Sequence, residues 1–297
     1  MSNYLLKHNE NVKIILRVTI VGIVANFVLV ALKLVAGLIF DNLSVVADAI
    51  HSASDLVTSL LLIIAVFISS PKRDKKHNYG HEKIESLVVL FFAMIIFGLG
   101  AVFIWQGIEG LISPRPSEFN VYLIVVTVIS LVIKEALFWY GMYYAKKTRS
   151  AMLRADAWHS RSDSLSSVAV LIGLISSTFM ANNILESVAV LIVSLFLFKV
   201  SFSILRPTIN QLIDKAADKK DVEKILEIAG NVKGVIKIDK MDTRILGSAI
   251  LVDLEIHIDG NLTVEQGHHI ADAVREILEN HPDLRIKRCN VHVNPSN

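Results

Sequence analysis

Six long apolar segments, separated by short polar stretches, fill roughly the first two thirds of the chain. Each is about 20 residues or longer, which is the length of helix that crosses a lipid bilayer. The expected spans are Ile14–Phe40, Leu43–Ser70, Ile84–Ile112, Val121–Tyr144, His159–Met180 and Ile184–Leu205. This pattern predicts a membrane domain that is an all-α bundle of six transmembrane helices.

The pattern changes near Pro207, where the apolar runs shorten and charged residues become more frequent. We therefore expect a transmembrane domain over residues 1–206 and a second, cytoplasmic domain over residues 207–297. In Ala249–Asp259 apolar and polar residues alternate, which is the period of a half-buried strand.

The elements expected in this second domain follow the order αββαβ. Helices are predicted at Lys220–Ala229 and Thr263–Asn280, and strands at Val235–Arg244, Ala249–Asp259 and Leu284–Val293. Thr263 is the expected N-cap of the second helix, and Pro295 is expected to end the third strand. This order predicts a small α+β domain of ferredoxin-like, or metallochaperone-like, architecture. The open edge or face of so small a sheet favours pairing with a second copy.

The composition supports a membrane protein. Hydrophobic residues make up 53% of the 297 residues, and the mean hydropathy is +0.53, which is more apolar than an ordinary soluble domain. The single cysteine, Cys289, excludes an intramolecular disulfide and a zinc site built from cysteines. The start of the chain is polar and basic, and no small-residue cleavage site follows the first apolar run, so we expect no cleavable signal peptide.

Basic residues gather on one side of the predicted bundle. They lie in the N-terminal segment, in the loop between the second and third spans, and in the loop between the fourth and fifth spans. These residues are Lys7, Lys13, Arg17, Lys72, Arg73, Lys75, Lys76, Lys83, Lys146, Lys147, Arg149 and Arg154. The loops on the other side contain a single basic residue, Arg115. Because positively charged loops stay in the cytoplasm, both termini are expected to be cytoplasmic, and an even number of spans agrees with this.

One pattern occurs twice, within or beside apolar segments: Ala47–Asp55 and Ala155–Asp163 both read A-D-A-x-H-S-x-S-D. In each copy the first Asp, the His and the last Asp stand at i, i+3 and i+7, so they share one face of a helix. The residues are Asp48, His51, Asp55, Asp156, His159 and Asp163. A single residue of this kind near a helix end would more simply be a cap or a solvated group. Ligand-type residues that are duplicated at membrane depth instead indicate an ion path.

Two facing helices would bring the side chains of His51, Asp55, His159 and Asp163 to one point. Two nitrogen and two oxygen donors suit a tetrahedral divalent ion, zinc first. Four protein ligands leave no open coordination position, so the site is not arranged for hydrolysis. Because these ligands bind a metal only when deprotonated, metal entry is expected to expel protons and protonation to help expel the metal.

Other charged residues in the spans are harder to assign. Asp48 and Asp156 lie one turn before each histidine, where they either orient the imidazole or interact with solvent or a neighbouring helix. Lys134 and Glu135 lie inside the fourth span. For Lys134 and Glu135 we favour mutual charge compensation or contact with a buried neighbour. A role in proton movement is the alternative, but no sequence motif supports it.

Two further groups of ligand-type residues lie outside the spans. One group lies at short spacing in the loop between the second and third spans and consists of Asp74, His77 and His81. These residues form either a metal site, with a fourth ligand from water or another residue, or a polar basic loop that happens to contain histidines. The group in the second domain is spread along the sequence, and surface residues of these types are usually solvated. It comprises Asp239, Asp253, His268, His269 and His292.

The duplicated motif and the loop resemble the cation diffusion facilitator family of divalent metal/proton antiporters. The loop run His77–Ser86 reads H-N-Y-G-H-E-K-I-E-S and is similar to the family's H-x-(F/Y)-G-H-x-K-x-E-S. The resemblance covers nearly the whole chain, including the six spans and the αββαβ tail.

The resemblance implies roles for individual residues. It implies a transport site of His51, Asp55, His159 and Asp163, a loop site of Asp74, His77 and His81, a tail site of Asp239, Asp253, His268 and His292, and a charge pair of Lys83 and Asp214. In the family this pair locks the membrane domain to the tail across a homodimer, and metal in the packed tails stabilises the transport-competent arrangement. Asp239 and Asp253 stand where some relatives have histidine, and Asn294 stands where some have aspartate, which weakens the tail site.

We therefore expect a secondary transporter that exports a divalent cation from the cytoplasm in exchange for protons, in the cell (inner) membrane. The His-Asp quartet is similar to that of zinc carriers, and Cd²⁺, Co²⁺, Fe²⁺ and Mn²⁺ are alternatives. The expected partners are metal ions, protons, membrane lipid and a second copy of the chain, with no nucleic acid and no prosthetic group.

Other functions are less consistent with the sequence. A membrane-bound metalloenzyme would need an open metal position, and H-E-x-x-H is absent. No G-x-x-x-x-G-K-[ST] occurs, so ATP-driven pumping by this chain is not expected. A metal sensor without transport remains an alternative, although a sensor needs no titratable quartet within two spans.

Overall fold

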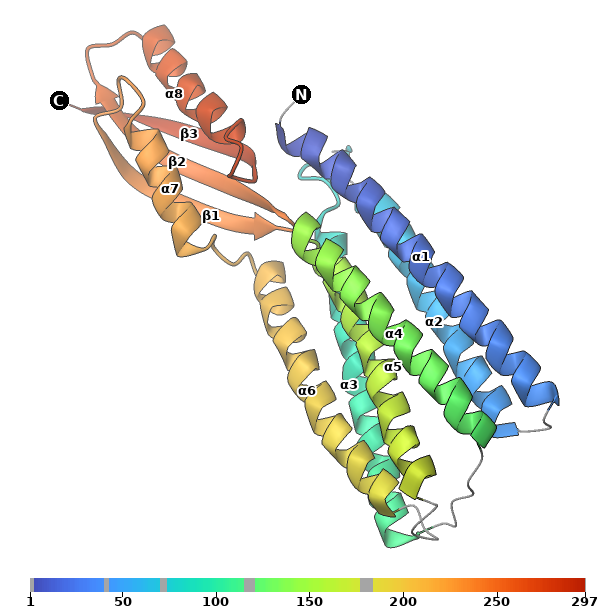
Figure 1. Ribbon diagram of the computed structural model, residues 1–297. Helices are drawn as coiled ribbons and strands as arrows, with labels where there is room; N and C mark the ends of the chain where they lie inside the picture. Colours follow the sequence, from blue (N-terminus) through green and yellow to red (C-terminus); the bar gives the residue numbers. More distant parts are fainter. Residues whose placement is uncertain (1–2, 40–42, 70–73, 115–120, 177–183, 297) are drawn as a thin grey trace. The chain divides into compact units, whose positions relative to one another are not determined.

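The computed structural model describes residues 3–39, 43–69, 74–114, 121–176 and 184–296 (Figure 1). For residues 3–8, 36, 37, 43–51, 54, 123, 170 and 174 within these ranges, only the backbone is described. Two compact units can be distinguished. One comprises residues 14–70 and 84–208, and the other comprises residues 1–13, 71–83 and 209–297.

Six long helices form the first part of the chain, as the apolar pattern predicts. They are α1 (Asn3–Ile39), α2 (Leu43–Ile68), α3 (Lys83–Ile112), α4 (Val121–Thr148), α5 (Ala151–Ser176) and α6 (Ile184–Leu212). Figure 1 shows their membrane-domain portions running side by side along most of their length. The predicted class, a helical membrane bundle followed by a small α+β domain, is confirmed.

Within the described residues, four helical segments are long and apolar enough to cross a membrane by themselves. They are Asn9–Val35, Lys83–Ile112, Ile124–Thr148 and Ile184–Leu212. The other two long helices, α2 and α5, carry the duplicated A-D-A-x-H-S-x-S-D motif, and the fully described part of α2 is a shorter apolar stretch, Asp55–Ile68. The fifth helix, α5, also carries four charged residues, Arg154, Asp156, Arg161 and Asp163, which lower its hydropathy.

Several helices extend beyond the predicted spans, and the first of them begins at Asn3, well before Ile14. The fifth helix begins at Ala151 and not at His159, because the hydroxyl of Ser150 accepts a hydrogen bond from the backbone N–H of Leu153 (3.2 Å) and caps the helix. The sixth helix does not end near Leu205 but continues through Pro207 to Leu212. Next to this proline, the Thr208 hydroxyl donates to the Ile204 carbonyl (2.6 Å).

Small residues allow the helices of the bundle to pack closely. A Cβ placed on Gly107 of α3 would lie 2.6 Å from Cγ of Leu191 on α6, which is too close for a non-bonded contact. On the same pair of helices, the Ser201 hydroxyl donates to the carbonyl of Ala93 (2.9 Å). Close approach at small residues together with interhelical hydrogen bonds is the usual way in which helices associate within a membrane.

The second domain has the predicted order αββαβ. Its elements are α7 (Lys219–Gly230), β1 (Lys237–Leu246), β2 (Ala249–Asp259), α8 (Val264–Glu279) and β3 (Ile286–Ser296). The sheet order is β1-β2-β3, with β1 antiparallel and β3 parallel to β2. The prediction that Pro295 ends the last strand is wrong: Pro295 pairs with Ile258, since β3 is an edge strand and an edge tolerates proline.

The core of this domain lies between one face of the sheet and the two helices. Alternate residues of β2, among them Val252, Leu254 and Ile256, are almost completely buried, whereas Asp253 between them is exposed. Ile225 of α7 and Val274 of α8 belong to the same apolar cluster. The other face of the sheet, which carries the intervening polar residues, is thus left available for ligands or partners.

We predict that Thr263→Ala loosens the start of α8. Thr263 forms a capping box with Gln266, in which its side chain accepts from the Gln266 backbone (3.2 Å) and the Gln266 side chain accepts from the Thr263 backbone (2.9 Å). Loss of such a cap costs about 1 kcal/mol, so amide hydrogen exchange in the first turn of α8 is expected to speed up about fivefold. Thr263→Ser keeps the acceptor and is expected to exchange like the parent; equal rates in the alanine variant would contradict the cap's role.

Candidate metal centres

A cluster of ionisable side chains lies at the centre of the membrane bundle. It contains Asp55 from α2, Lys134 from α4, and His159 and Asp163 from α5, and each of these residues is at least nine-tenths buried. The positions of the two motif copies on α2 and α5 bring Asp55, His159 and Asp163 together, with one ligand atom of each lying within 4.8 Å of the others. Three of the four residues that we expected at the transport site therefore lie close together: His159 and Asp163 from α5 and Asp55 from α2.

Lys134 joins the two carboxylates. Its Nζ donates to Oδ2 of Asp55 (2.6 Å) and to Oδ2 of Asp163 (2.7 Å), so a single ammonium group bridges α2 and α5. Contact with a buried neighbour, one of the two interpretations that we favoured for Lys134, is what the structure shows. Mutual compensation with Glu135 is not: Glu135 instead lies 3.5 Å from Arg161 and accepts a hydrogen bond from Ser164.

The imidazole of His159 is poorly satisfied by the described protein groups. Its Nε2 lies 3.6 Å from Oδ1 of Asp55, and neither ring nitrogen makes a hydrogen bond within the described part of the chain. The ring of Phe92, on α3, lies 6.0 Å away, centroid to centroid. A buried imidazole nitrogen normally has a partner, so His159 has the lone pair and the surroundings of a metal ligand.

The remaining motif residues contribute differently. The side chains of His51 and Asp48 lie outside the described residues, although the α2 backbone there is helical and places His51 one turn before Asp55. Asp156 lies one turn before His159 on α5 and is only partly buried. Near this part of α2, the Nζ of Lys33 from α1 donates to the hydroxyl of Ser52 (2.9 Å).

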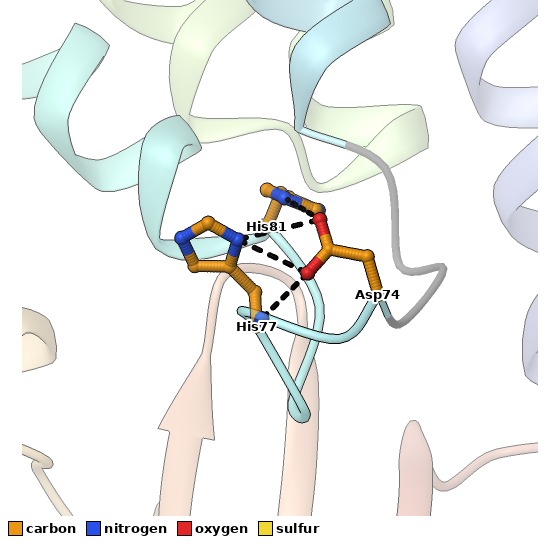
Figure 2. Close-up of side chains that lie close together, drawn as sticks. All are labelled: Asp74, His77 and His81. Atoms are coloured by element: carbon orange, nitrogen blue, oxygen red, sulfur yellow. Dashed lines mark hydrogen bonds and ion pairs between the residues drawn. The ribbon is translucent and has the colours of Figure 1, made fainter.

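A second cluster lies in the loop before α3 and consists of Asp74, His77 and His81, as Figure 2 shows. Oδ2 of Asp74 is 3.2 Å from Nε2 of His81, and Oδ1 is 3.3 Å from Nδ1 of His77. The centroids of the two imidazole rings are 4.5 Å apart, and the ring planes are tilted by 54°. Gly80, at φ 88°, permits the tight turn that brings His81 back beside His77.

The loop backbone holds Asp74 in its ionised form. The backbone N–H groups of His77 (2.6 Å) and Lys76 (2.8 Å) donate to Oδ1, and these hydrogen bonds lower the pKa of the Asp74 carboxyl below its usual value. At neutral pH the loop therefore offers one carboxylate oxygen and two imidazoles within 4.8 Å of one another. These donors fit a zinc-like ion, for which water or another residue would supply the fourth ligand.

The same loop is attached to the sheet domain. Glu82, which is almost fully buried, forms an ion pair with Lys287 of β3, and Nζ of Lys287 also donates to the carbonyl of Tyr79 (2.8 Å). Arg244 and Arg288 lie 5.1 and 5.8 Å from the Tyr79 ring centroid. His81 thus directly precedes a residue that forms an ion pair with the sheet.

The predicted charge pair forms within a single chain. Nζ of Lys83 lies 3.1 Å from Oδ1 of Asp214, and both side chains are about half exposed. An exposed pair of this kind contributes little to stability by itself. Its expected role across a dimer stays a prediction.

The four ligands predicted in the tail do not form one cluster within a single chain. Asp253 and His292 line the same open groove of about 330 Å³ on the polar face of the sheet, and Asp253 accepts a hydrogen bond from Asn290 (2.7 Å). Asp239 lies 3.7 Å from His257, and His268 lies 3.3 Å from Asp272 on α8. The tail site stays a prediction.

The bridge that Lys134 forms between two helices and the ion pair of Glu82 with Lys287 were not predicted from the sequence. A lysine in the middle of an apolar span was the only signal for the first contact. No signal pointed to the second, because its partners are 205 residues apart and meet only through the fold.

Six helices of spanning length that enclose a buried set of carboxylate and imidazole ligands define a membrane transporter for cations. Comparison with known proteins agrees. The family model of the cation efflux transmembrane domain matches residues 19–213, and that of the cation efflux protein cytoplasmic domain matches residues 217–296. The chain therefore belongs to the cation efflux family, the cation diffusion facilitators, whose members are transporters of divalent metal cations and not enzymes.

Several relatives resemble the chain along most of its length. It is 35% identical to an uncharacterized transporter of Methanocaldococcus jannaschii, over 92% of this chain and 96% of that protein. It is 30% identical to the manganese efflux system protein MneP of Bacillus subtilis, over 97% and 98%. Among solved structures, MamM-CTD 215-293 is 29% identical over 26% of this chain and 98% of its own, with a TM-score of 0.25. The family makes divalent metal ions the partners of this chain, and its cytoplasmic dimerisation domain supports a homodimer.

We predict that Asp74→Ala and His77→Ala each weaken zinc binding at the loop by more than about tenfold, since the loss of even an indirect partner of a metal ligand costs that much. Binding would be measured by equilibrium titration in a chain that also carries Asp55→Ala and Asp163→Ala, so that the intramembrane cluster does not contribute. Lys75→Ala, in the same exposed loop, is the matched control. Unchanged affinity in both loop variants would contradict a metal site there.

Proposed function

We propose that this protein exports a divalent metal ion, Zn²⁺ first, from the cytoplasm in exchange for protons. The observation that carries the proposal is the convergence of Asp55, His159 and Asp163 on one buried point between α2 and α5. Ionisable groups are costly at membrane depth and are found there chiefly where ions or protons pass. His51, one turn before Asp55 on α2, is the fourth proposed ligand.

The donor atoms suit an ion that must be released again. Carboxylate oxygens and imidazole nitrogens bind zinc without the thiolates that make structural sites so tight. The single cysteine, Cys289, is buried in the sheet domain, where burial raises the pKa of its thiol to about 12, so it is no ligand for the cargo. A shell of weakly held oxygen and nitrogen donors is what reversible transport requires.

Exchange with protons is proposed from the same atoms. A histidine binds a metal only through a neutral nitrogen, and an imidazole in water has a pKa of about 6.5, so metal and protons compete for such a ligand near physiological pH. We infer that metal entering from the cytoplasm releases protons and that protonation from the other side expels the metal. The inward pH gradient of a cell membrane would then drive export.

The observations on the identity of the metal favour two different ions. The presence of imidazole among the ligands favours zinc, whereas carboxylates accept manganese as well. One relative, at 30% identity, is named a manganese efflux system protein. We propose zinc because at least one ligand of the described cluster is a histidine, and manganese is the second candidate.

We further propose that both termini and the sheet domain are cytoplasmic, in the inner membrane of a cell, and that the domain boundary lies at residues 206 and 207. The basic loops between the spans support this orientation. The tails are proposed to pack as a homodimer, with metal at Asp239, Asp253, His268 and His292 stabilising it. Lys83 and Asp214 are proposed to lock the membrane domain to the tail.

We predict that Asp55→Ala and His159→Ala abolish metal flux. Purified protein would be reconstituted in sealed liposomes with an imposed pH gradient, and zinc flux followed with a fluorescent indicator. Each variant removes one ligand from the buried cluster, so flux is expected to fall by at least about tenfold. Glu109→Ala, which removes an exposed carboxylate from α3, is the control and is expected to transport like the parent.

Three outcomes of this experiment are informative. Flux that needs the pH gradient and is lost in both variants would support a proton-coupled carrier with this site. Flux that survives both changes would move the transport site elsewhere. Tight binding without flux of any divalent ion would favour a metal sensor and contradict the proposal.

We predict that His159→Asp raises the uptake of cadmium or manganese relative to zinc. The change replaces a nitrogen donor by an oxygen donor, and carboxylate-rich sites favour manganese more than imidazole-rich ones do. Initial rates in the same vesicles would be measured for each metal alone, in parent and variant. Unchanged relative rates would show that His159 does not set the selectivity.

A further inference from the structure

One lysine holds the described transport-site carboxylates together. Lys134 lies in the middle of α4, and only 3% of its surface is exposed. Its Nζ is 2.6 Å from an oxygen of Asp55 on α2 and 2.7 Å from an oxygen of Asp163 on α5. The ammonium therefore contacts two of the residues that we propose as ligands for the metal, each from a different helix.

This position gives the ammonium an electrostatic role when no metal is bound. Two carboxylates that face each other in a buried place repel each other and lose their hydration, and a charge that is buried without a partner is strongly destabilising. Lys134 supplies a positive charge between them. Since it donates a hydrogen bond to both, it also satisfies one oxygen of each carboxylate.

The same position brings the ammonium into conflict with the metal. A zinc-like ion needs oxygen ligands at about 2.0–2.2 Å and draws on the same two carboxylates. The ligand atoms of Asp55, His159 and Asp163 lie within 4.8 Å of one another, so an ion among them would lie beside the ammonium. Repulsion between the two cations is screened little in a buried place.

We propose that Lys134 is a tethered counter-cation that fills the transport site when the site is empty and leaves it when the metal binds. The proposal rests on the proposed function, in which Asp55 and Asp163 are ligands of the transported ion. A lysine suits this exchange because its ammonium is a compact charge on a flexible four-carbon stem.

Two consequences for transport follow. First, Lys134 lowers the affinity for the metal, because the ion binds only during the fraction of time in which the ammonium is displaced. Secondly, it favours release, because the ammonium returns to the carboxylates as the ion departs. The carrier can then change conformation in either state with a cation between its buried carboxylates, which are costly at membrane depth when unpaired.

The experiment compares metal affinity and transport in variants of Lys134. Lys134→Met removes the charge and keeps an unbranched side chain of similar length, and Lys134→Gln removes the charge but keeps a hydrogen-bond donor. In both variants the Kd for zinc is expected to fall by at least about tenfold, as it would if the ammonium holds the site for about nine tenths of the time or more. The kcat for zinc flux is expected to fall together with KM, because release becomes slow. Lys134→Arg keeps the charge and is expected to stay near the parent in affinity.

Lys199→Met is the matched control, since it removes a lysine charge from an exposed position on another helix, α6, and is expected to leave the Kd unchanged. An unchanged or higher Kd in the neutral Lys134 variants would overturn the proposal, and a higher Kd would make Lys134 a residue that positions the ligands. If Lys134→Met does not fold, Lys134→Gln decides the matter by the same criterion.

Asp55→Ala and Asp163→Ala, measured alongside, separate this inference from the function on which it rests. If they lose zinc binding and flux while the neutral Lys134 variants bind like the parent, only the role of Lys134 is wrong. If they bind and transport like the parent, the transport site lies elsewhere and both proposals are wrong.

Discussion

Charge compensation within an apolar bundle is the constraint on which this structure depends. Asp55 and Asp163 are each more than nine-tenths buried, and burial of two unpaired carboxylates would strongly destabilise the bundle. Lys134 resolves this by bridging them from a third helix. The bridge fixes α2, α4 and α5 around one point, and a divalent cation is a natural replacement for an ammonium at that point. Under the proposed function, stability of the empty bundle and recognition of the cargo use the same carboxylates.

In the loop before α3, residues that can bind a metal also lie beside a buried ion pair. Asp74, His77 and His81 provide three metal donors, and the next residue, Glu82, is paired with Lys287 in the sheet. Binding of an ion by this loop would order the chain beside that buried pair. The helices of the sheet domain cover one face of the sheet, and Asp253 on the other face is exposed, as expected of a domain that pairs with a second copy.

Much of this arrangement could be predicted from the sequence because the signals are local. Spanning helices follow from apolar length, and the αββαβ tail follows from alternation and from the cap at Thr263. The motif spacing placed Asp55 and His159 each on one face of a helix, and their meeting followed from the assumption that the two motif helices face each other. The bridge through Lys134 could not be predicted, because the partner of a lone lysine depends on which helix faces which. The early start of the fifth helix and the passage of β3 through Pro295 were also missed, since a serine cap and an edge position depend on three-dimensional context.

The central claim is that the cargo and the ammonium of Lys134 compete for the same two carboxylates. A structure of the full protein determined with zinc bound tests it most directly. The account predicts one ion within about 2.2 Å of an oxygen of Asp55 and of an oxygen of Asp163, with Nζ of Lys134 moved beyond hydrogen-bond distance of both. An ion bound elsewhere in the membrane bundle, with Lys134 still between the carboxylates, would contradict the account.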